Sequence, residues 1–340
     1  MISAKTLLAF LVATSSIAVS ASDYKVIAHY PVGGDVRFDY LRVDPDMRRL
    51  YVSHGSKVDV LDADTGTRIG EIAPTNGVHG IAIVPGLRRG FITAGADRSV
   101  VVFDVDTLKV TKVITGLGVK PDAIEYDPQS GRVYVANGTS GGVTVIDPRT
   151  AEIVSNIPIQ GKLEGMAFDG RGRLFVNTEN KSLIQVIDTV SLKPLASWSI
   201  TPVEGGTGLA IDAAHHRLFS AGGNAMLAVV DSDTGALVAK PPIGLDPDGD
   251  AFDSSTGTIF TSNVGGTVSV IKEGPGGGTF SLEQTVPTAA GARTIALDSK
   301  TGRLFLCTGK FLPAPQPTAD NPHPRPKGVP GSFEVLVVGR

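Results

Sequence analysis

The sequence is poor in cysteine and tryptophan, with one residue of each among its 340 residues. Because Cys307 is the only cysteine, no disulfide can form within the chain, and metal or haem motifs that need paired cysteines are excluded. A lone thiol in an oxidising compartment is more often buried than reactive. Stability must therefore come from packing, for which a composition of 41% hydrophobic residues is ample.

An excess of positive charge is also missing. The chain has 31 lysines and arginines against 34 aspartates and glutamates, which gives a formal net charge of −3. This balance does not favour nucleic acid or an anionic membrane surface as a partner. No Gly-x-Ser-x-Gly nucleophile motif occurs, and the glycine-rich run 274–278 lacks the lysine ending of a phosphate-binding loop.

No apolar run is long enough to span a membrane. Near the N-terminus, Lys5 precedes a short apolar run over 7–12, and small residues follow up to Ala21. This order is typical of a secretory signal peptide, so we predict a cleaved leader over 1–21 and a single mature domain over 22–340. The protein is therefore expected to be periplasmic or secreted.

A sustained helical period is absent as well, whereas a short aromatic strand returns at regular intervals. It often follows an arginine, as in 49–52 (RLYV) and 132–135 (RVYV). The aromatic residues of these strands are Tyr51, Phe91, Tyr134, Phe175, Phe219, Phe260 and Phe305. Successive members lie 40, 43, 41, 44, 41 and 45 residues apart. Seven copies of such a unit predict an all-β fold, a β-propeller with seven four-stranded blades.

The count of outer strands predicts how this propeller is closed. Six fourth strands begin within the array, near Arg68, Lys109, Glu152, Lys193, Ala236 and Phe280. A seventh, 24–30, precedes the first inner strand and has no blade of its own, while the last copy, 292–338, has only three strands. We therefore expect the N-terminal strand to complete the last blade, which removes an exposed sheet edge.

The aromatic strand of the third repeat, 134–137, reads Tyr-Val-Ala-Asn, and 51–54 and 260–263 are looser versions of it. This element resembles the Tyr-Val-Thr-Asn motif of the YVTN-repeat (YncE-like) propellers, and the resemblance covers the whole mature chain. It implies the same seven-bladed fold. Because such propellers serve both as binding platforms and as enzyme domains, the resemblance leaves the function open.

Propeller topology predicts which polar residues converge on one face. Antiparallel strands bring the connections between blades and the loops after each second strand to the same end of the channel. The connections contribute Arg37, Asp39, His79, Asp122, Glu164, Thr207, Asp248 and Arg293. The loops contribute His54, Asn137, Asn177, Glu179, Asn224 and Asn263. The expected ligand-binding residues are Arg37, Asp39, His54, Asn137, Asn177, Asn224, Asn263 and Arg293.

Four residues of this face are candidates for catalysis or for a divalent cation site, namely His79, Asp122, Glu164 and Asp248. Like charges that are packed together raise one another's pKa unless a cation is present. Oxygen ligands suit Ca²⁺, whereas histidine favours a transition metal. In a rival arrangement, Arg37 and Arg293 pair with the carboxylates or bind an anionic ligand. A purely structural use of the carboxylates, as acceptors for neighbouring backbone groups, is a third possibility.

A proline-rich insertion, 310–330, separates the second and third strands of the last blade. Its seven prolines make it stiff and extended. Long loops in compact domains are usually functional or disordered. We expect this one either to form a rim over the polar funnel, with His323 near its distal part, or to lie across a neighbouring blade.

Export, a rigid scaffold and the lack of a recognised catalytic motif favour a binding platform, for a small molecule or a periplasmic protein. The alternative is a metal-dependent propeller enzyme of the lactonase or hydrolase kind. In such an enzyme a central cation polarises a carbonyl group or lowers the pKa of a bound water. We expect a monomer.

Overall fold

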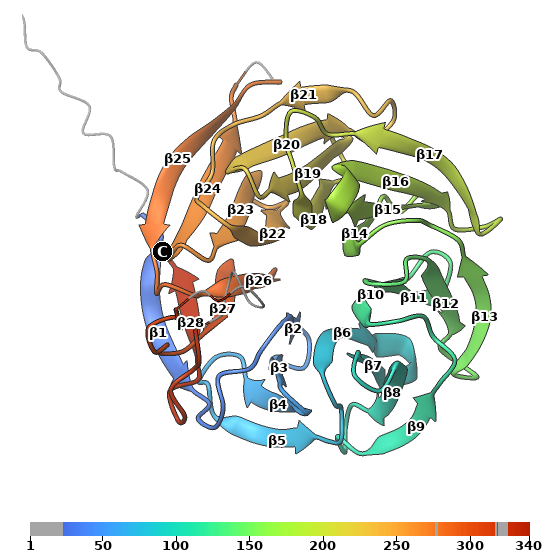
Figure 1. Ribbon diagram of the computed structural model, residues 1–340, viewed down its shortest axis with the longest axis vertical. Helices are drawn as coiled ribbons and strands as arrows, with labels where there is room; N and C mark the ends of the chain where they lie inside the picture. Colours follow the sequence, from blue (N-terminus) through green and yellow to red (C-terminus); the bar gives the residue numbers. More distant parts are fainter. Residues whose placement is uncertain (1–22, 276–277, 317, 319–325) are drawn as a thin grey trace, which may run out of the picture.

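The chain forms seven four-stranded antiparallel sheets arranged around a central channel, as the repeats predict (Figure 1). The computed structural model describes residues 23–275, 278–316, 318 and 326–340, so the predicted leader lies outside the described residues. The helical segments of the described chain are two short 3-10 turns, Pro85–Leu87 and Glu179–Lys181. No helix within these ranges has the length and apolar character needed to cross a membrane.

Each blade runs from an inner strand beside the channel to an outer strand at the rim (Figure 1). The first blade consists of β2 (Leu41–Asp44), β3 (Arg49–His54), β4 (Lys57–Asp62) and β5 (Arg68–Ile72). The second consists of β6 (Val78–Val84), β7 (Arg89–Ala94), β8 (Ser99–Asp104) and β9 (Val110–Ile114). The third consists of β10 (Pro121–Asp127), β11 (Arg132–Asn137), β12 (Val143–Asp147) and β13 (Glu152–Ile157).

The remaining blades follow the same order. The fourth consists of β14 (Leu163–Phe168), β15 (Arg173–Thr178), β16 (Leu183–Asp188) and β17 (Lys193–Ser199). The fifth consists of β18 (Gly206–Asp212), β19 (Arg217–Gly222), β20 (Met226–Asp231) and β21 (Leu237–Ala239). The sixth consists of β22 (Pro247–Asp253), β23 (Thr258–Asn263), β24 (Thr267–Glu273) and β25 (Phe280–Pro287).

The seventh blade joins both ends of the chain. It consists of β26 (Arg293–Asp298), β27 (Arg303–Thr308), β28 (Glu334–Gly339) and the N-terminal strand β1 (Lys25–Pro31). β1 pairs antiparallel with β28, and Figure 1 shows the two strands side by side at the rim. The predicted closure by the N-terminal strand is therefore confirmed, and it leaves the ring without a gap between its first and last blades.

The seven repeated aromatic residues lie in the core between blades, and each of their side chains is at most 1% exposed. Tyr51 of the first blade packs against Phe103 of the second, with ring centroids 5.8 Å apart. Burial of a side chain of this size contributes about 1.5–3 kcal/mol, so the aromatic repeat is a main source of stability. Cys307 on β27 is also fully buried, and burial raises the pKa of its thiol.

Aspartates at the ends of strands fix the turns. The Oδ1 atom of Asp62 accepts hydrogen bonds from the backbone N–H groups of Asp64 and Thr65, at 3.0 and 2.8 Å. Asp104 and Asp231 accept the same pair of bonds in their own blades. These are local Asx turns, which hold the third and fourth strands in register.

The start of the inner strand is irregular in six of the seven blades. β6, for example, shifts register against β7 between Val78 and Ile81, and β14 shifts against β15 between Leu163 and Met166. Such bulges bend a strand and redirect its side chains. The first blade differs, because β2 begins only at Leu41 and pairs with β3 without a shift. The bulges lie at the end of the channel where the polar residues were predicted.

Candidate functional site

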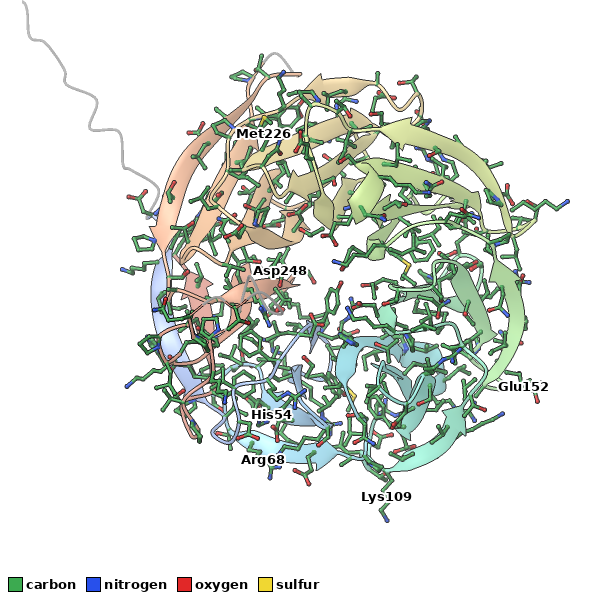
Figure 2. The ribbon with its side chains drawn as sticks, viewed as in Figure 1. His54, Arg68, Lys109, Glu152, Met226 and Asp248 are labelled. Carbon is green, nitrogen blue, oxygen red and sulfur yellow. The ribbon has the colours of Figure 1, made fainter. Side chains whose placement is uncertain are left out.

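One position of the repeat supplies a ring of polar side chains at one end of the channel. In each blade a single inner-strand residue pairs with the buried aromatic residue, for example Ala82 with Phe91 and Glu125 with Tyr134. The residue three places before this anchor is polar in every blade. We call these seven the mouth ring: Asp39, His79, Asp122, Glu164, Thr207, Asp248 and Arg293. Figure 2 shows one member, Asp248, beside the channel.

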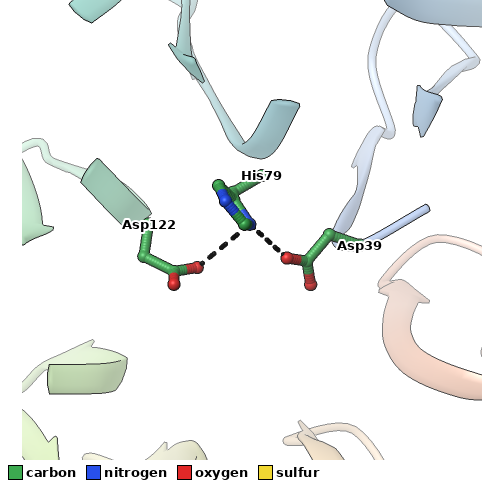
Figure 3. A group of neighbouring side chains, drawn as sticks. All are labelled: Asp39, His79 and Asp122. Atoms are coloured by element: carbon green, nitrogen blue, oxygen red, sulfur yellow. Dashed lines mark hydrogen bonds and ion pairs between the residues drawn. The ribbon is translucent and has the colours of Figure 1, made fainter. Parts of the chain in front are cut away.

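Three consecutive members of the mouth ring meet at one point (Figure 3). The Nδ1 atom of His79 hydrogen-bonds with Asp39 and lies 3.5 Å from the Oδ1 atom of Asp122. One ligand atom from each of the three residues lies within 4.8 Å of the other two, which is a geometry that can hold a metal ion. His79 and Asp122 were predicted for this role. Glu164 and Asp248, which were predicted with them, lie outside this group, and Asp39 belongs to it instead.

Burial and neighbouring charges act against each other on the ionisable groups of this site. Burial opposes the charged form of the His79 imidazole, but the hydrogen bond to Asp39 and the charge of Asp122 outweigh it and raise the pKa of His79. Burial and the nearby charge of Asp39 raise the pKa of Asp122, although His79 and Lys120 oppose them. A neighbouring carboxylate is among the causes of both pKa shifts, and a bound cation would reduce the repulsion between Asp39 and Asp122.

Two further carboxyl groups of the mouth ring, those of Glu164 and Asp248, have raised pKa values. Burial, and then the charge of Asp122, raise the pKa of Glu164 to about 8. Burial, and then the charge of Asp39, raise the pKa of Asp248 to about 7. Each of these two carboxyl groups therefore gains or loses its proton near neutral pH, as ionisable groups in functional sites often do.

Basic side chains lie beside these carboxylates, and the two lysines among them are more exposed than their partners. Lys120 approaches Asp122 at 2.7 Å, Lys162 approaches Glu164 at 3.0 Å, and Arg293 lies 3.7 Å from Asp248. The side chain of Lys120 is 40% exposed, whereas that of Asp122 is 3% exposed. The pair of Lys162 and Glu164 shows the same order, at 46% and 15%. The mouth thus has an acidic interior and a basic rim.

Below the mouth ring the channel contains a cavity of about 230 Å³, which is lined by all seven inner strands. Glu164, Thr207 and Asp248 line its upper part, together with Tyr40. The Thr207 hydroxyl donates to the backbone oxygen of Pro247 at 2.9 Å, so it links the fifth and sixth blades. The site therefore extends inward from the face of the propeller into the channel.

The structure does not bring His54 to the mouth ring. Its Nδ1 atom lies 2.7 Å from Asp59 and its Nε2 atom 2.8 Å from the backbone oxygen of Asp35, and its ring contacts Phe333. Figure 2 shows His54 in the first blade, away from the channel. Arg37 is exposed and lines a shallow hollow together with His54.

Three of the predicted asparagines are buried within their blades: Asn137, Asn177 and Asn263. Their side-chain amide groups donate to backbone oxygens, those of Gly142, Gly208 and Thr267 respectively. Asn224 is exposed and donates to the backbone oxygen of Pro202 at 2.9 Å. The Asn177 amide thus links the fourth blade to the fifth, whereas the amides of Asn137 and Asn263 bond within their own blades. The part of all four asparagines in ligand binding stays a prediction.

The described ends of the proline-rich insertion pair with each other. Leu312 donates to the backbone oxygen of Lys327 and Val329 to that of Lys310, both at 2.8 Å. Gly328 packs closely on Val36, which precedes Asp39 by three residues, so the base of the insertion lies on the same face as the mouth ring. His323 and its neighbours lie outside the described residues.

The sequence analysis missed Tyr40, Lys120 and Lys162. The two lysines stand two residues before Asp122 and Glu164, a spacing that the repeat alignment contains. Tyr40 directly follows a mouth-ring residue, where the other blades have small side chains. A comparison of the seven repeats at every position identifies all three residues.

Comparison with known proteins supports the fold. No protein-family model matches the chain, and no curated protein matches its sequence. A solved structure titled Kuenenia stuttgartiensis hydrazine synthase is similar with a TM-score of 0.67 and 18% identity, covering 80% of this chain and 92% of the other. The structure of U3-55K is similar with a TM-score of 0.74 and 12% identity, covering 92% and 98%. At such identities the likeness concerns the fold alone.

Proposed function

We propose that this protein is an exported binding platform whose site is the mouth ring, and that its ligand is a small cation. A divalent metal ion held by Asp39, His79 and Asp122 is the first candidate. Its family, in this proposal, is that of the YVTN-repeat propellers. The single observation behind the ligand class is the meeting of one imidazole and two carboxylate groups within 4.8 Å.

The donor set indicates which metal ions fit. An imidazole nitrogen with two carboxylate oxygens suits Zn²⁺ or Mn²⁺ better than Ca²⁺, which takes six to eight oxygen ligands. The three donors come from three consecutive blades, so the rigid ring fixes their spacing before any ion arrives. Such preorganisation reduces the cost of binding.

Titration calorimetry of the mature protein with Zn²⁺, Mn²⁺ and Ca²⁺, combined with elemental analysis of the purified protein, tests this proposal. His79→Gln should remove most of the binding. His215→Gln is a matched control, because His215 also lies 2.7 Å from an aspartate, Asp212, but in a distant exposed turn. The proposal fails if no metal copurifies and none binds, or if both variants lose binding equally.

A second candidate function is a metal-dependent hydrolase that uses the same site. The observation that favours it is the pair Glu164 and Asp248, whose pKa values of about 8 and about 7 suit proton transfer at neutral pH. A metal ion at Asp39, His79 and Asp122 would polarise an ester or lactone carbonyl group. Glu164 or Asp248 would then take a proton from the attacking water.

Hydrolysis assays separate the two functions. The protein loaded with Mn²⁺ or Zn²⁺ should hydrolyse a simple lactone or aryl ester if it is an enzyme, and Glu164→Gln should lower kcat while metal binding is retained. A loaded protein that binds metal but gives no turnover above the metal-free protein is a binding platform only.

A further inference from the structure

The position that follows the mouth ring in the repeat is occupied by small residues in six blades. These residues are Gly80, Ala123, Gly165, Gly208, Gly249 and Thr294. In the first blade the same position holds Tyr40, the only large side chain of the set. A deviation of this size within a repeat needs a physical explanation.

Small residues are required here because the next blade is too close. A Cβ atom at Gly165 would lie 2.7 Å from the backbone nitrogen of Leu209. At Gly208 it would lie 2.5 Å from that of Asp250. Contacts of this length with backbone atoms cannot be relieved by a side-chain rotation. A tyrosine in the same orientation would push neighbouring inner strands apart.

Tyr40 avoids this clash because the first blade begins differently. β2 starts after Tyr40 and lacks the bulge of the other inner strands, so Tyr40 lies in the segment that leads into the strand. Its backbone oxygen accepts a hydrogen bond from Ser53, and its side chain packs against the core cluster of the third and fourth blades. A side chain that starts in the first blade and reaches these blades must cross the channel.

The Tyr40 side chain shares the channel cavity with acidic side chains of the mouth ring. The mouth-ring carboxyl groups that line the same cavity as Tyr40 are those of Glu164 and Asp248. Within the described part of the chain, no hydrogen bond to the hydroxyl is formed. Tyr40 also lines the channel cavity, so the group faces open space. An unpaired hydroxyl in a cavity that it shares with the acidic side chains of Glu164 and Asp248 favours a positively charged neighbour.

We infer that Tyr40 is the floor of the mouth site. Its ring closes the channel beneath the mouth ring, and its hydroxyl oxygen accepts a hydrogen bond from the bound cation, either an ammonium group or a water molecule on a metal ion. The part of this inference that concerns the ligand rests on the function proposed above. The shared chemistry of the two ligands is a positive charge that carries hydrogen-bond donors.

Two variants separate the ring from the hydroxyl. Tyr40→Phe keeps the ring and should weaken binding about 5-fold, the effect of one neutral hydrogen bond. Tyr40→Gly places at this position the residue that four other blades have, and should weaken binding by about 30-fold or more, because water then enters from below. Tyr126→Phe is the control, since Tyr126 lines the far end of the channel. Calorimetry with Mn²⁺ and with methylammonium distinguishes the two kinds of cation.

The outcomes distinguish this inference from the proposed function. If the wild type binds but Tyr40→Phe binds equally well, the hydroxyl contact is refuted while the platform survives. If Tyr40→Gly binds no more weakly than Tyr40→Phe, the ring is not a floor. If the wild type binds neither cation, the proposed function fails and the ligand contact fails with it.

Discussion

The two ends of the central channel are built by the same seven inner strands, yet they carry opposite chemistry. At one end lies the mouth ring. At the other end, the residue directly after the anchor position is apolar in every blade: Val43, Ile83, Tyr126, Phe168, Ile211, Phe252 and Leu297. Apolar groups at this end pack and stabilise, whereas crowded carboxylates at the mouth oppose folding. Buried aspartates also occur at the other end, but those such as Asp127 and Asp298 accept hydrogen bonds from backbone N–H groups of turns. The mouth is the place where acidic side chains and an imidazole face one another, which favours a function there.

Between these two ends, two positions of the inner strands carry side chains that differ from those of the other blades. The residue just before the anchor is aliphatic or methionine in six blades, but it is Asp250 in the sixth. The anchor itself is alanine in five blades, but Arg42 in the first and Glu125 in the third, and these two side chains form an ion pair across the channel. The following predictions use such positions to test how far the two ends differ.

The largest effect is expected at the mouth. Asp122→Asn removes one charged donor from the group of three and should weaken Mn²⁺ binding by about 100-fold or more. Phe252→Leu at the opposite end should leave the affinity unchanged. Calorimetry on both variants measures the contrast, with circular dichroism to confirm that each is folded. Equal losses in the two variants would remove the distinction between the ends.

The next effect concerns stability and the exception at Asp250. Its Oδ2 atom accepts a hydrogen bond from Ala221, its Oδ1 atom is buried without a partner, and burial raises its pKa to about 8. The folded state therefore holds a proton that the unfolded state releases near pH 4, so this group costs stability increasingly between about pH 4 and pH 8.

Asp250→Leu introduces the residue type of the other blades. The variant should be more stable than the wild type, and this difference in unfolding free energy should be about 2 kcal/mol larger at pH 8.5 than at pH 5. Urea denaturation at the two pH values measures this difference. Asp250→Asn should also lose the pH dependence but gain less, because it remains polar. A gain that is the same at both pH values would show that the carboxyl group does not titrate in the folded state as described.

The affinity for a cation should increase with pH, whereas the stability of the wild-type protein at Asp250 decreases with pH. The raised pKa values of His79, Asp122, Glu164 and Asp248 mean that protons occupy the empty mouth and compete with a cation. Affinity for Mn²⁺ should therefore rise about tenfold between pH 6.5 and pH 8, as about one proton is displaced. Calorimetry in buffers of different ionisation enthalpy counts the released protons. Binding that is independent of pH, with no proton release, would place the ion elsewhere.

The smallest effect is expected from the ion pair in the channel. Arg42 and Glu125 are each about one-third exposed, and such pairs contribute about 0–1 kcal/mol. Replacing both by alanine, the residue of the other blades, should change the unfolding free energy by less than about 1 kcal/mol and leave cation binding intact. A double-mutant cycle in urea measures the coupling. A coupling of several kcal/mol would mean that the pair, and not packing, holds the lower channel together.

The sequence analysis predicted the composition of the mouth ring but not its internal contacts. All seven members were expected on one face, because each occupies the same place in the repeat. The asparagines and His54 were grouped with them since their loops emerge at the same end. The structure shows why they differ. Four of these residues lie at the end of a second strand, and Asn224 lies just after one, so all are about one strand spacing of 4.8 Å further from the axis. There, neighbouring polar groups engage their side chains.

The sequence by itself determined the number of blades, the buried aromatic residues and the closure by β1, because these follow from local strand patterns that recur at a fixed spacing. Only the tertiary structure decided that Asp39 meets His79 and Asp122 while Glu164 and Asp248 lie apart. It also decided that Tyr40 crosses the channel. Both depend on the direction of side chains at bulges and strand starts, where a shift of one residue redirects a group toward the axis or away from it.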